Sequence, residues 1–214
     1  MILYDIKNQK TKRQLIGHKE SILAVELSKN GKRMISIGSN GHTILWDYYS
    51  GEIIQEFQIK ISGRSQQVVL NKEGSLLAYT YDNNICVKNL ESKIDIDWVA
   101  GYKVDFNDMM FSPNSNYLIT VSDNGVYDYE VDIWDVKKRL KVNCLHDGNG
   151  YVSASISNDG EYLVTGTREG KAYVFDFNGG GLGSRSDGKM TEMSVLTEAA
   201  DLEVVLDYFQ DFSQ

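Results

Sequence analysis

Few side chains in this 214-residue chain are of the types that carry out catalysis. It has three histidines, His18, His42 and His146, and two cysteines, Cys86 and Cys144. Nucleophilic catalysis needs a base within hydrogen-bond reach of a serine or cysteine, and a third group that orients the base. No local motif supplies such a set, so the sequence predicts no catalytic residue and no cofactor. We expect His42, in a hairpin turn, to face solvent.

Metal-ligating residue types are also present without the spacing of a metal site. The two cysteines lack a Cys-x-x-Cys pattern and lie in strand-like runs, so we expect them to be small buried hydrophobic residues rather than zinc ligands. The densest acidic group of the first 190 residues does not have the spacing of a calcium loop. Its members are Asp123, Asp128, Glu130 and Asp132. We predict a solvated turn there and no metal site.

Basic side chains gather at two places that each follow a similar strand ending. They are Lys7, Lys10, Lys12 and Arg13, and then Lys137, Lys138, Arg139 and Lys141. If both groups lie on one rim of the molecule, that rim could attract phosphate or an acidic peptide. Ordinary solvated turns are the alternative. We do not expect nucleic acid as a partner, because these groups are not interleaved with aromatic residues and the charge around them is balanced.

Composition is that of an ordinary soluble domain, with 42 % hydrophobic and 24 % charged residues. No apolar run approaches the roughly 18 residues of a membrane-spanning helix. The chain has two cysteines, no Asn-x-Ser/Thr site and no start resembling a secretory signal. We therefore expect an intracellular protein, in the cytoplasm or the nucleus.

The formal net charge of −8 is unevenly distributed. Six of the 30 acidic residues lie after residue 190, where there is no lysine or arginine, and the remaining 24 nearly balance the 22 basic residues. A nearly neutral body therefore precedes an acidic tail, and a partner of one charge cannot be inferred for the whole chain.

Two sequence markers recur in phase along the first 178 residues. The first is a strand ending, spaced 42, 42, 46 and 41 residues apart: Ile2-Leu-Tyr-Asp5, Ile44-Leu-Trp-Asp47, Cys86-Val-Lys-Asn89, Asp132-Ile-Trp-Asp135 and Tyr173-Val-Phe-Asp176. The second is a tight turn between apolar runs: Ser28-Lys-Asn-Gly, Asn71-Lys-Glu-Gly, Ser112-Pro-Asn-Ser and Ser157-Asn-Asp-Gly. Short β-branched and aromatic runs between such turns are typical of antiparallel strands. Four strands in about 42 residues fit a propeller blade.

These residues resemble the WD-repeat β-propeller family. The second repeat matches most fully, from Gly17-His18 through the turn at Ser28 to Trp46-Asp47. The resemblance implies an all-β fold of four-stranded antiparallel blades, and a hydrogen-bonded tetrad of a loop His, a strand Ser or Thr, a turn Asp and the Trp. His18, Ser36 and Trp46 fit this tetrad, with Asn40 at the position of the acid.

Later repeats match the tetrad less well. The third has Asp82 at the turn position but Lys88-Asn89 in place of Trp-Asp, and the fourth has Trp134-Asp135 without a clear acid. In the fifth, the imperfect substitutes are His146, Thr165, Glu169 and Phe175. We expect a partner-binding face near His18, Asn40, Asp82 and Glu169, where the resemblance implies that turns and inter-blade loops converge.

Four repeats and a first strand ending are fewer than the seven or eight blades that the resemblance implies. An open ring would expose strand edges and an apolar face. Three interpretations remain: the strand at residues 12–17 completes the fifth blade and closes a small ring, two chains pair to make eight blades, or the chain is a piece of a longer propeller. The start in the middle of a blade favours the last.

The repeats end at residue 178, before a Gly/Ser-rich segment at 179–190 that is either a flexible linker or a cloning scar. Residues 191–214 form a separate acidic region with apolar residues at three- and four-residue steps, which predicts an amphipathic helix. The apolar stripe consists of Val195, Leu196, Ala199, Leu202, Val205, Leu206 and Phe209. The helix would pack on its own propeller, dock on another protein or pair with its copy, and disorder is the alternative.

The sequence thus predicts a non-catalytic protein-interaction scaffold with other proteins as partners, and the tail helix as a second docking element. Strands supply a rigid support, and loops are free for recognition. Two alternatives are a regulatory or targeting propeller segment of a larger enzyme, and a structural subunit that self-assembles through open blade edges, as a homo-oligomer.

Overall fold

The computed structural model describes residues 1–61, 67–82, 84–92, 98–101, 105–123, 129–145, 150–177 and 192–193. Within these ranges every regular element is a β-strand. The chain divides into two compact units, Met1–Phe111 and Ser112–Gln214. Of the sequence predictions, His146, Asp128, the linker at 179–190 and the tail from residue 194, with Val195, Leu196, Ala199, Leu202, Val205, Leu206 and Phe209, lie outside the described residues.

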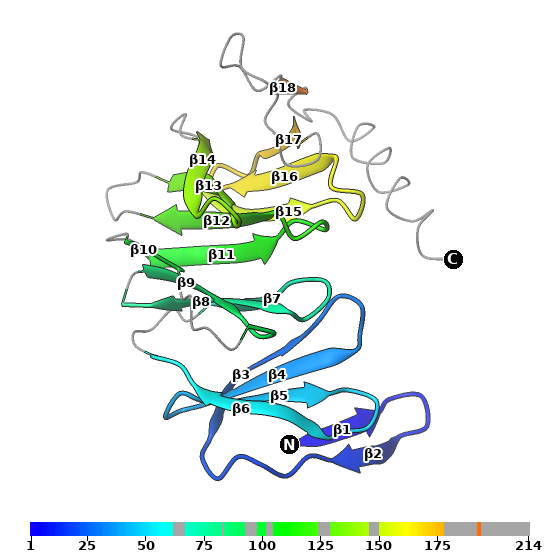
Figure 1. Ribbon diagram of the computed structural model, residues 1–214. Helices are drawn as coiled ribbons and strands as arrows, with labels where there is room; N and C mark the ends of the chain where they lie inside the picture. The colour runs from blue at the N-terminus through cyan, green and yellow to red at the C-terminus, as the bar shows by residue number, and fades with distance from the viewer. Residues whose placement is uncertain are drawn as a thin grey trace. The chain divides into compact units, whose positions relative to one another are not determined.

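Unit 1 contains the first eleven strands (Figure 1). They are β1 (Ile2–Asp5), β2 (Lys10–Gln14), β3 (Ile22–Leu27), β4 (Arg33–Gly38), β5 (His42–Asp47), β6 (Ile53–Gln58), β7 (Val68–Leu70), β8 (Leu76–Tyr81), β9 (Asn84–Asn89), β10 (Trp98–Gly101) and β11 (Asp105–Phe111). β1 and β2 form a two-stranded sheet, whereas β3-β4-β5-β6 and β7-β8-β9-β10 form four-stranded sheets in chain order. All neighbouring strands in these three sheets are antiparallel, so each sheet is a meander.

The strands of unit 2 continue this pattern. They are β12 (Tyr117–Asp123), β13 (Tyr129–Asp135), β14 (Leu140–Leu145), β15 (Tyr151–Ile156), β16 (Tyr162–Thr167), β17 (Ala172–Asp176) and β18 (Glu192–Met193). The sheet orders are β11-β12-β13-β14 and β15-β16-β17-β18. The prediction of all-β structure in four-stranded antiparallel sheets is therefore confirmed for the second to fifth repeats, while the first repeat contributes β1 and β2 alone.

In the tight turns, the side chain of the first residue forms a hydrogen bond with the backbone at the start of the strand that follows. The hydroxyl oxygens of Ser28, Ser112 and Ser157 accept hydrogen bonds from the backbone N–H five residues later, at 2.9, 3.0 and 2.9 Å. The fourth residue of the turn is left-handed, with φ of 69° at Gly31 and 61° at Ser115. This local chemistry explains why the Ser-x-x-Gly marker recurs with the repeat.

Burial follows the position of a strand in its sheet. The inner strands β4 and β5 are buried along most of their length, because side chains on both of their faces pack in a core. One core cluster joins Ile35, Ile37 and Leu45 to Leu70 and Leu77 of the next sheet. A second core cluster joins Leu15, Met34, Ile44 and Trp46, with Met1 and Leu3 packed against it. The β1–β2 hairpin is thereby fixed to the second repeat.

Two predictions about the chain ends are corrected by strand pairing. One of the three interpretations of the blade number had the strand at residues 12–17 complete the fifth blade, but Lys10–Gln14 pairs with β1. The fourth position of the fifth sheet is taken by β18, which pairs with Val174 and Phe175. Glu192 and Met193 were assigned to the tail helix and are instead a short strand.

Candidate functional site

The predicted tetrad residues of the second repeat lie together. His18 Nε2 is 2.7 Å from Ser36 Oγ, and Trp46 Nε1 donates a hydrogen bond to the same oxygen at 2.8 Å. Ser36 and Trp46 lie on the neighbouring strands β4 and β5, and His18 is on the loop that leads into β3. A Cβ at Gly17 would be 2.9 Å from Trp46 Cη2. Glycine before the histidine therefore lets the loop close over the buried indole.

The acid of this network is Glu20, which sequence reasoning missed. Glu20 Oε1 is 2.8 Å from His18 Nδ1, and the backbone N–H of Lys19 donates to Glu20 Oε2 at 3.1 Å. Asn40, expected at this position, is exposed, and its Oδ1 accepts the backbone N–H of His42 at 2.9 Å. A Cβ at Gly38 would overlap the Glu20 side chain, with Cδ only 2.7 Å away. The glycine at the end of β4 thus makes room for an acid from a different loop.

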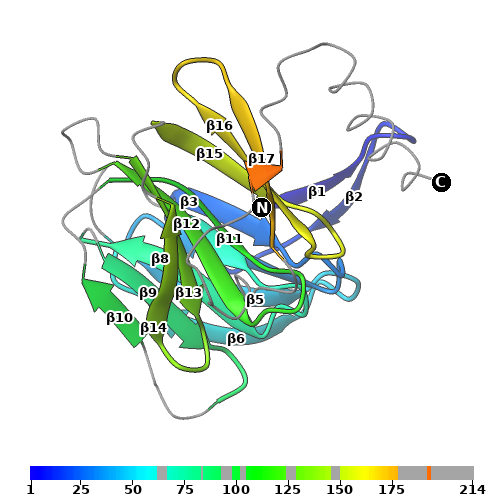
Figure 2. The same cartoon turned by 90° about the horizontal axis from the view of Figure 1, so that it is seen from above.

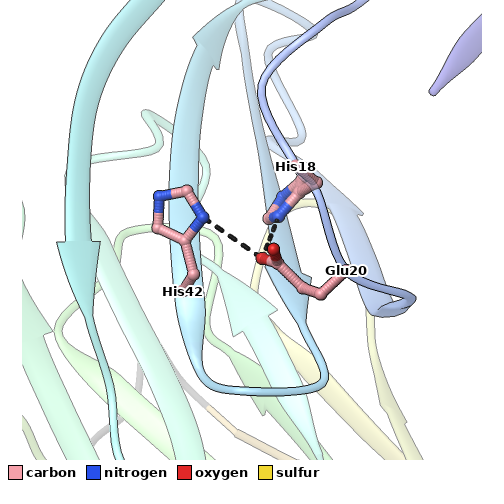
Figure 3. A group of neighbouring side chains, drawn as sticks. All are labelled: His18, Glu20 and His42. Carbon is pink, nitrogen blue, oxygen red and sulfur yellow. Dashed lines mark hydrogen bonds and ion pairs between the residues drawn. The ribbon is translucent and has the colours of Figure 1, made fainter.

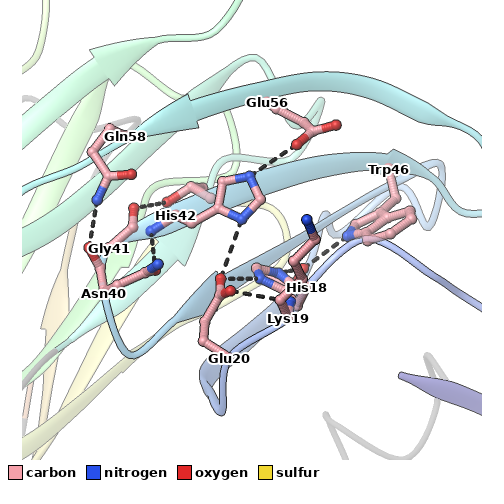
Figure 4. Close-up of polar contacts among 11 residues, drawn as sticks. His18, Lys19, Glu20, Asn40, Gly41, His42, Trp46, Glu56 and Gln58 are labelled. Atoms are coloured by element: carbon pink, nitrogen blue, oxygen red, sulfur yellow. Dashed lines mark hydrogen bonds and ion pairs between the residues drawn. The ribbon is translucent and has the colours of Figure 1, made fainter.

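His42 extends the network instead of facing solvent. Its Nδ1 is 3.1 Å from Glu20 Oε1, the oxygen that also meets His18, and its Nε2 is 2.9 Å from Glu56 Oε2 on β6 (Figures 3 and 4). The two imidazole rings meet edge to face, with centroids 5.2 Å apart. We call His18, Glu20, His42 and Glu56 the His–Glu cluster.

Electrostatics of the cluster centre on Glu20. The hydrogen bond from His18 lowers the pKa of Glu20 to about 2, helped by the Lys19 N–H and by His42, and these bonds outweigh the effect of burial, which raises it. Glu20 is therefore a carboxylate over the whole physiological range. Exposure rises across the cluster, with 4 % of the His18 side chain, 16 % of Glu20 and 26 % of His42 accessible.

Other repeats keep parts of the tetrad. In the fourth, Trp134 Nε1 donates to Thr120 Oγ1 at 3.0 Å, a partner that the sequence analysis did not name. In the fifth, Phe175 takes the place of the Trp and has no N–H, and Thr165 Oγ1 is buried with no hydrogen-bond partner among the described residues. In the third, Lys88 replaces the Trp and places its Nζ 5.6 Å from the Phe57 ring centroid.

Two groups of side chains within the described ranges have the composition of a metal site. One is His18, Glu20 and His42, and the other is Glu130, Asp132 and Cys144. In the second group Lys141 Nζ lies 3.1 Å from Asp132 Oδ1 and 3.8 Å from Glu130 Oε2, so an internal cation already balances the acids. Burial raises the pKa of the Cys144 thiol, which keeps it protonated. Asp132 is buried, so the expectation of a solvated turn is wrong for this residue.

The first repeat leaves a strand edge open within the described residues. β1 has β2 as its sheet neighbour (Figures 1 and 2), whereas the equivalent strand β5 lies between β4 and β6 (Figure 1). Matching the strand endings places Ile2 with Ile44 and Tyr4 with Trp46. Ile2 and Tyr4 are 60 % and 57 % exposed, while Ile44 and Trp46 are 0 % and 1 % exposed. Side chains that form the core elsewhere are thus accessible on β1.

The neighbouring face of β3 is open in the same way. Leu27 pairs with Met34 and Val25 with Ser36, so these residues share the face of β4 that the β1–β2 hairpin covers. The hairpin reaches Met34, but it leaves Leu23, Val25 and Leu27 exposed. Leu27 is 45 % exposed, against 4 %, 3 % and 7 % for the equivalent Leu70, Phe111 and Ile156. We call Leu23, Val25 and Leu27 the open β3 face.

Comparison with known proteins identifies these repeats. The family model described as "WD domain, G-beta repeat" matches residues 9–47 and 139–176, which contain β2–β5 and β14–β17. A crystal structure of the β-propeller domain of Cps50 (Swd1) from Myceliophteria thermophila aligns with a TM-score of 0.69 over 88 % of this chain and 62 % of that one, at 15 % identity. Residues 9–47 and 139–176 are therefore WD repeats, and the fold is that of a β-propeller.

Several WD-repeat relatives share about a quarter of their aligned residues with this chain. WD repeat-containing protein 36 of Homo sapiens is 23 % identical, over 70 % of this chain and 16 % of that protein. Periodic tryptophan protein 2 of Saccharomyces cerevisiae is 24 % identical over 82 % and 20 %, and eukaryotic translation initiation factor 3 subunit I of Drosophila willistoni is 25 % identical over 75 % and 52 %. The chain spans about half the length of these relatives or less.

The two basic groups lie in different units of this WD-repeat chain, and several members are engaged locally. Lys138 pairs with Asp135 at 3.2 Å, and Lys12 Nζ lies 5.4 Å from the Tyr48 ring centroid. Arg13 packs against Gly51, where a Cβ would lie 2.5 Å from its Cδ. Lys10 and Lys137 are exposed, as is Arg139 at a left-handed turn position with φ of 60°. The shared basic rim stays a prediction.

Among other predicted positions, Asp82 lies exposed at the β8–β9 turn with φ of 48°, and Glu169 pairs with Lys171 at 2.7 Å. Cys86 is buried, as expected for a small hydrophobic residue. The part of the WD-repeat chain that the structure describes contains no helix long and apolar enough to cross a membrane.

Proposed function

We propose that this chain is a non-catalytic protein-interaction scaffold whose partner adds β-structure to the first repeat. The observation that carries the proposal is the two-stranded β1–β2 sheet beside the open β3 face. A strand edge presents unpaired N–H and C=O groups, and an extended partner segment pairs with them. The exposed apolar side chains beside the edge give such a partner a surface to bury.

The partner that fits this surface is a protein segment of two antiparallel strands with alternating apolar residues. Compared with the four-stranded sheets, the described part of the first repeat has no strand beside β1, equivalent to β4, and no strand beyond it, equivalent to β3. The inner face of the added pair would cover Val25 and Leu27, as the first two strands of the other repeats cover their neighbours. Ile2 and Tyr4 would then lie on an inner strand.

The relatives support a role in protein complexes. One of them is named as a subunit of a eukaryotic translation initiation factor. We infer from these relatives that the chain acts inside the cell, in the cytoplasm or the nucleus, as part of an assembly. The tail helix, with Leu202 and Phe209 on its predicted apolar stripe, stays a second proposed docking element.

Binding of a hairpin peptide tests the proposal. A labelled peptide copying residues 150–168 contains β15 and β16 with their Ser157 turn, and it represents the two strands that the first repeat lacks. We expect saturable binding to the full chain by fluorescence anisotropy. Val25→Asp combined with Leu27→Asp should weaken binding more than tenfold, because both charges would be buried under the peptide.

A matched pair of substitutions controls for general loss of apolar surface. Ile53 and Ile54 on β6 are exposed to a similar degree, and Ile53→Asp with Ile54→Asp should leave peptide binding unchanged. Absence of saturable binding to the wild-type chain, or equal loss in both double variants, would overturn the proposed docking surface. Sedimentation of the chain without peptide tests the alternative partner, a second copy: a concentration-dependent dimer abolished by the β3 substitutions would identify self-assembly.

A further inference from the structure

The His–Glu cluster has the ligand set of a zinc site. We propose that His18, Glu20 and His42 bind one Zn²⁺ ion through His18 Nδ1, Glu20 Oε1 and His42 Nδ1, beside the network that holds Trp46. Two imidazoles and one carboxylate are common protein ligands of zinc, and a site with three protein ligands leaves a fourth position open. This inference is independent of the proposed scaffold function.

Convergence of the three ligand atoms is the first support. They lie within 4.8 Å of one another, and Glu20 Oε1 is 2.8 Å from His18 Nδ1 and 3.1 Å from His42 Nδ1 (Figure 3). Zinc bonds of about 2.0–2.1 Å in a tetrahedral arrangement place ligand atoms about 3.3 Å apart. The two ligand pairs that include Glu20 Oε1 would therefore need to separate by only a few tenths of an ångström to admit the ion.

The second support is what the other ring nitrogens contact. A histidine that binds zinc usually donates its remaining N–H to an oxygen, which fixes the ring and its tautomer. His42 Nε2 faces Glu56 Oε2 at 2.9 Å, and His18 Nε2 faces Ser36 Oγ at 2.7 Å. The Ser36 hydroxyl oxygen has two lone pairs, so it can accept both His18 Nε2–H and the Trp46 indole N–H. Both rings are thus held with Nδ1 toward Glu20.

The hydrogen-bond chemistry of the carboxylates gives the third support. A carboxylate only accepts hydrogen bonds, so His42 satisfies Glu20 and Glu56 together only when both of its nitrogens carry protons. Zn²⁺ at Nδ1 would replace the proton on that side and leave the Nε2–H for Glu56. His18 would likewise bind the ion through the unprotonated Nδ1 of a neutral ring whose Nε2–H faces Ser36 Oγ. In both rings a neutral imidazole would then meet the ion at Nδ1 and an oxygen at Nε2.

Charge and access distinguish this cluster from the other candidate group. No lysine or arginine side chain pairs with Glu20 in the described part of the chain, whereas Lys141 neutralises the group around Asp132. The 26 % exposed His42 side chain gives the ion a path from solvent, while the 4 % exposed His18 is fixed from within. Gly38 keeps the space that the Glu20 side chain occupies.

Zinc titration of the full chain, after removal of metals with a chelator, tests the proposal. We expect one Zn²⁺ per chain by isothermal titration calorimetry, and visible absorption typical of tetrahedral coordination when Co²⁺ is used instead. His42→Gln should weaken zinc affinity by at least tenfold. Glu56→Ala should weaken it by about 10–100-fold, because Glu56 only orients His42. Binding should weaken at acidic pH, because protons compete with the ion.

The controls separate the site from general effects of charge and folding. Glu52→Ala removes an exposed glutamate from the turn that precedes β6, the strand that carries Glu56, and should leave zinc affinity unchanged. His42→Gln leaves the His18–Ser36–Trp46 contacts intact, so a wild-type thermal melt in the absence of zinc shows that the variant folds. Absence of saturable Zn²⁺ binding, or wild-type affinity in His42→Gln, would overturn the proposal.

Discussion

Valine substitutions at Thr120 and Thr165 separate the energy of the Trp hydrogen bond from that of packing. The two threonines occupy equivalent positions on the inner strands β12 and β16, both in unit 2, and are 0 % and 1 % exposed. Trp134 Nε1 donates to Thr120 Oγ1 at 3.0 Å. Phe175 stands at the Trp position of the fifth repeat, where Thr165 Oγ1 has no hydrogen-bond partner among the described residues.

Valine has nearly the shape of threonine, so the two variants differ mainly in what happens to the polar groups. Thr120→Val leaves the buried indole N–H without an acceptor, which should lower the free energy of unfolding by about 1–3 kcal/mol. Thr165→Val removes a buried hydroxyl that has already lost its contacts with water, so we expect no loss and a gain of up to about 1 kcal/mol. The two variants should therefore differ by about 1–4 kcal/mol.

Urea denaturation followed by circular dichroism measures the free energy of unfolding of each variant. Both substitutions lie in unit 2, and equal m-values would show that the two free energies can be compared directly. In thermal melts, each 1 kcal/mol should shift the Tm by about 2–4 °C for a chain of this size. If Thr165→Val destabilises the protein as much as Thr120→Val does, the argument that only Thr120 has a hydrogen-bond partner is wrong.

Three further changes have defined outcomes. Trp46→Ala should cost about 3–5 kcal/mol, because the buried indole packs under Gly17, and an unchanged thermal melt would refute that role. Glu20→Gln should make the free energy of unfolding depend less on pH between pH 4.5 and about 2, which thermal melts at acidic pH measure. The reason is that a carboxyl whose pKa is lowered by folding stabilises the fold above its ordinary pKa, and this contribution is lost as the pH falls toward the lowered pKa. Deleting residues 179–214 removes β18 but should keep the β-rich circular dichroism, whereas aggregation would show that the segment covers apolar surface.

The repeat could be predicted from sequence because its determinants are local. The strand ending with Trp46-Asp47, the turn opened by Ser28 and the Gly17-His18 pair each depend on a few adjacent residues. Strand pairing follows once turns of this kind separate alternating apolar runs. The contacts of His18 and Trp46 with Ser36 could be anticipated only through the family resemblance, which supplies the register between strands.

The His–Glu cluster could not be predicted, since it depends on contacts between separate strands. Glu56 reaches His42 because β6 pairs with β5, where His42 stands opposite Gln58, two residues from Glu56. Glu20 fits only because Gly38 has no side chain. A glutamate two residues after the loop histidine was the one available signal. Sequence reasoning assigned the acid to the turn at Asn40, where the family pattern has it.

The free edge of β1 also sets how the protein exchanges its amide hydrogens. In antiparallel pairing, alternate residues point their N–H groups to opposite sides of a strand. On β5 both sides are paired, but within the described residues β1 is paired only on the side toward β2. The amides of Ile2–Asp5 that point away from β2 should therefore exchange faster than the equivalent amides of Ile44–Asp47. A strand added by a partner would slow exchange at the unprotected amides, so binding would be detectable as a gain in local stability at the N-terminal hairpin.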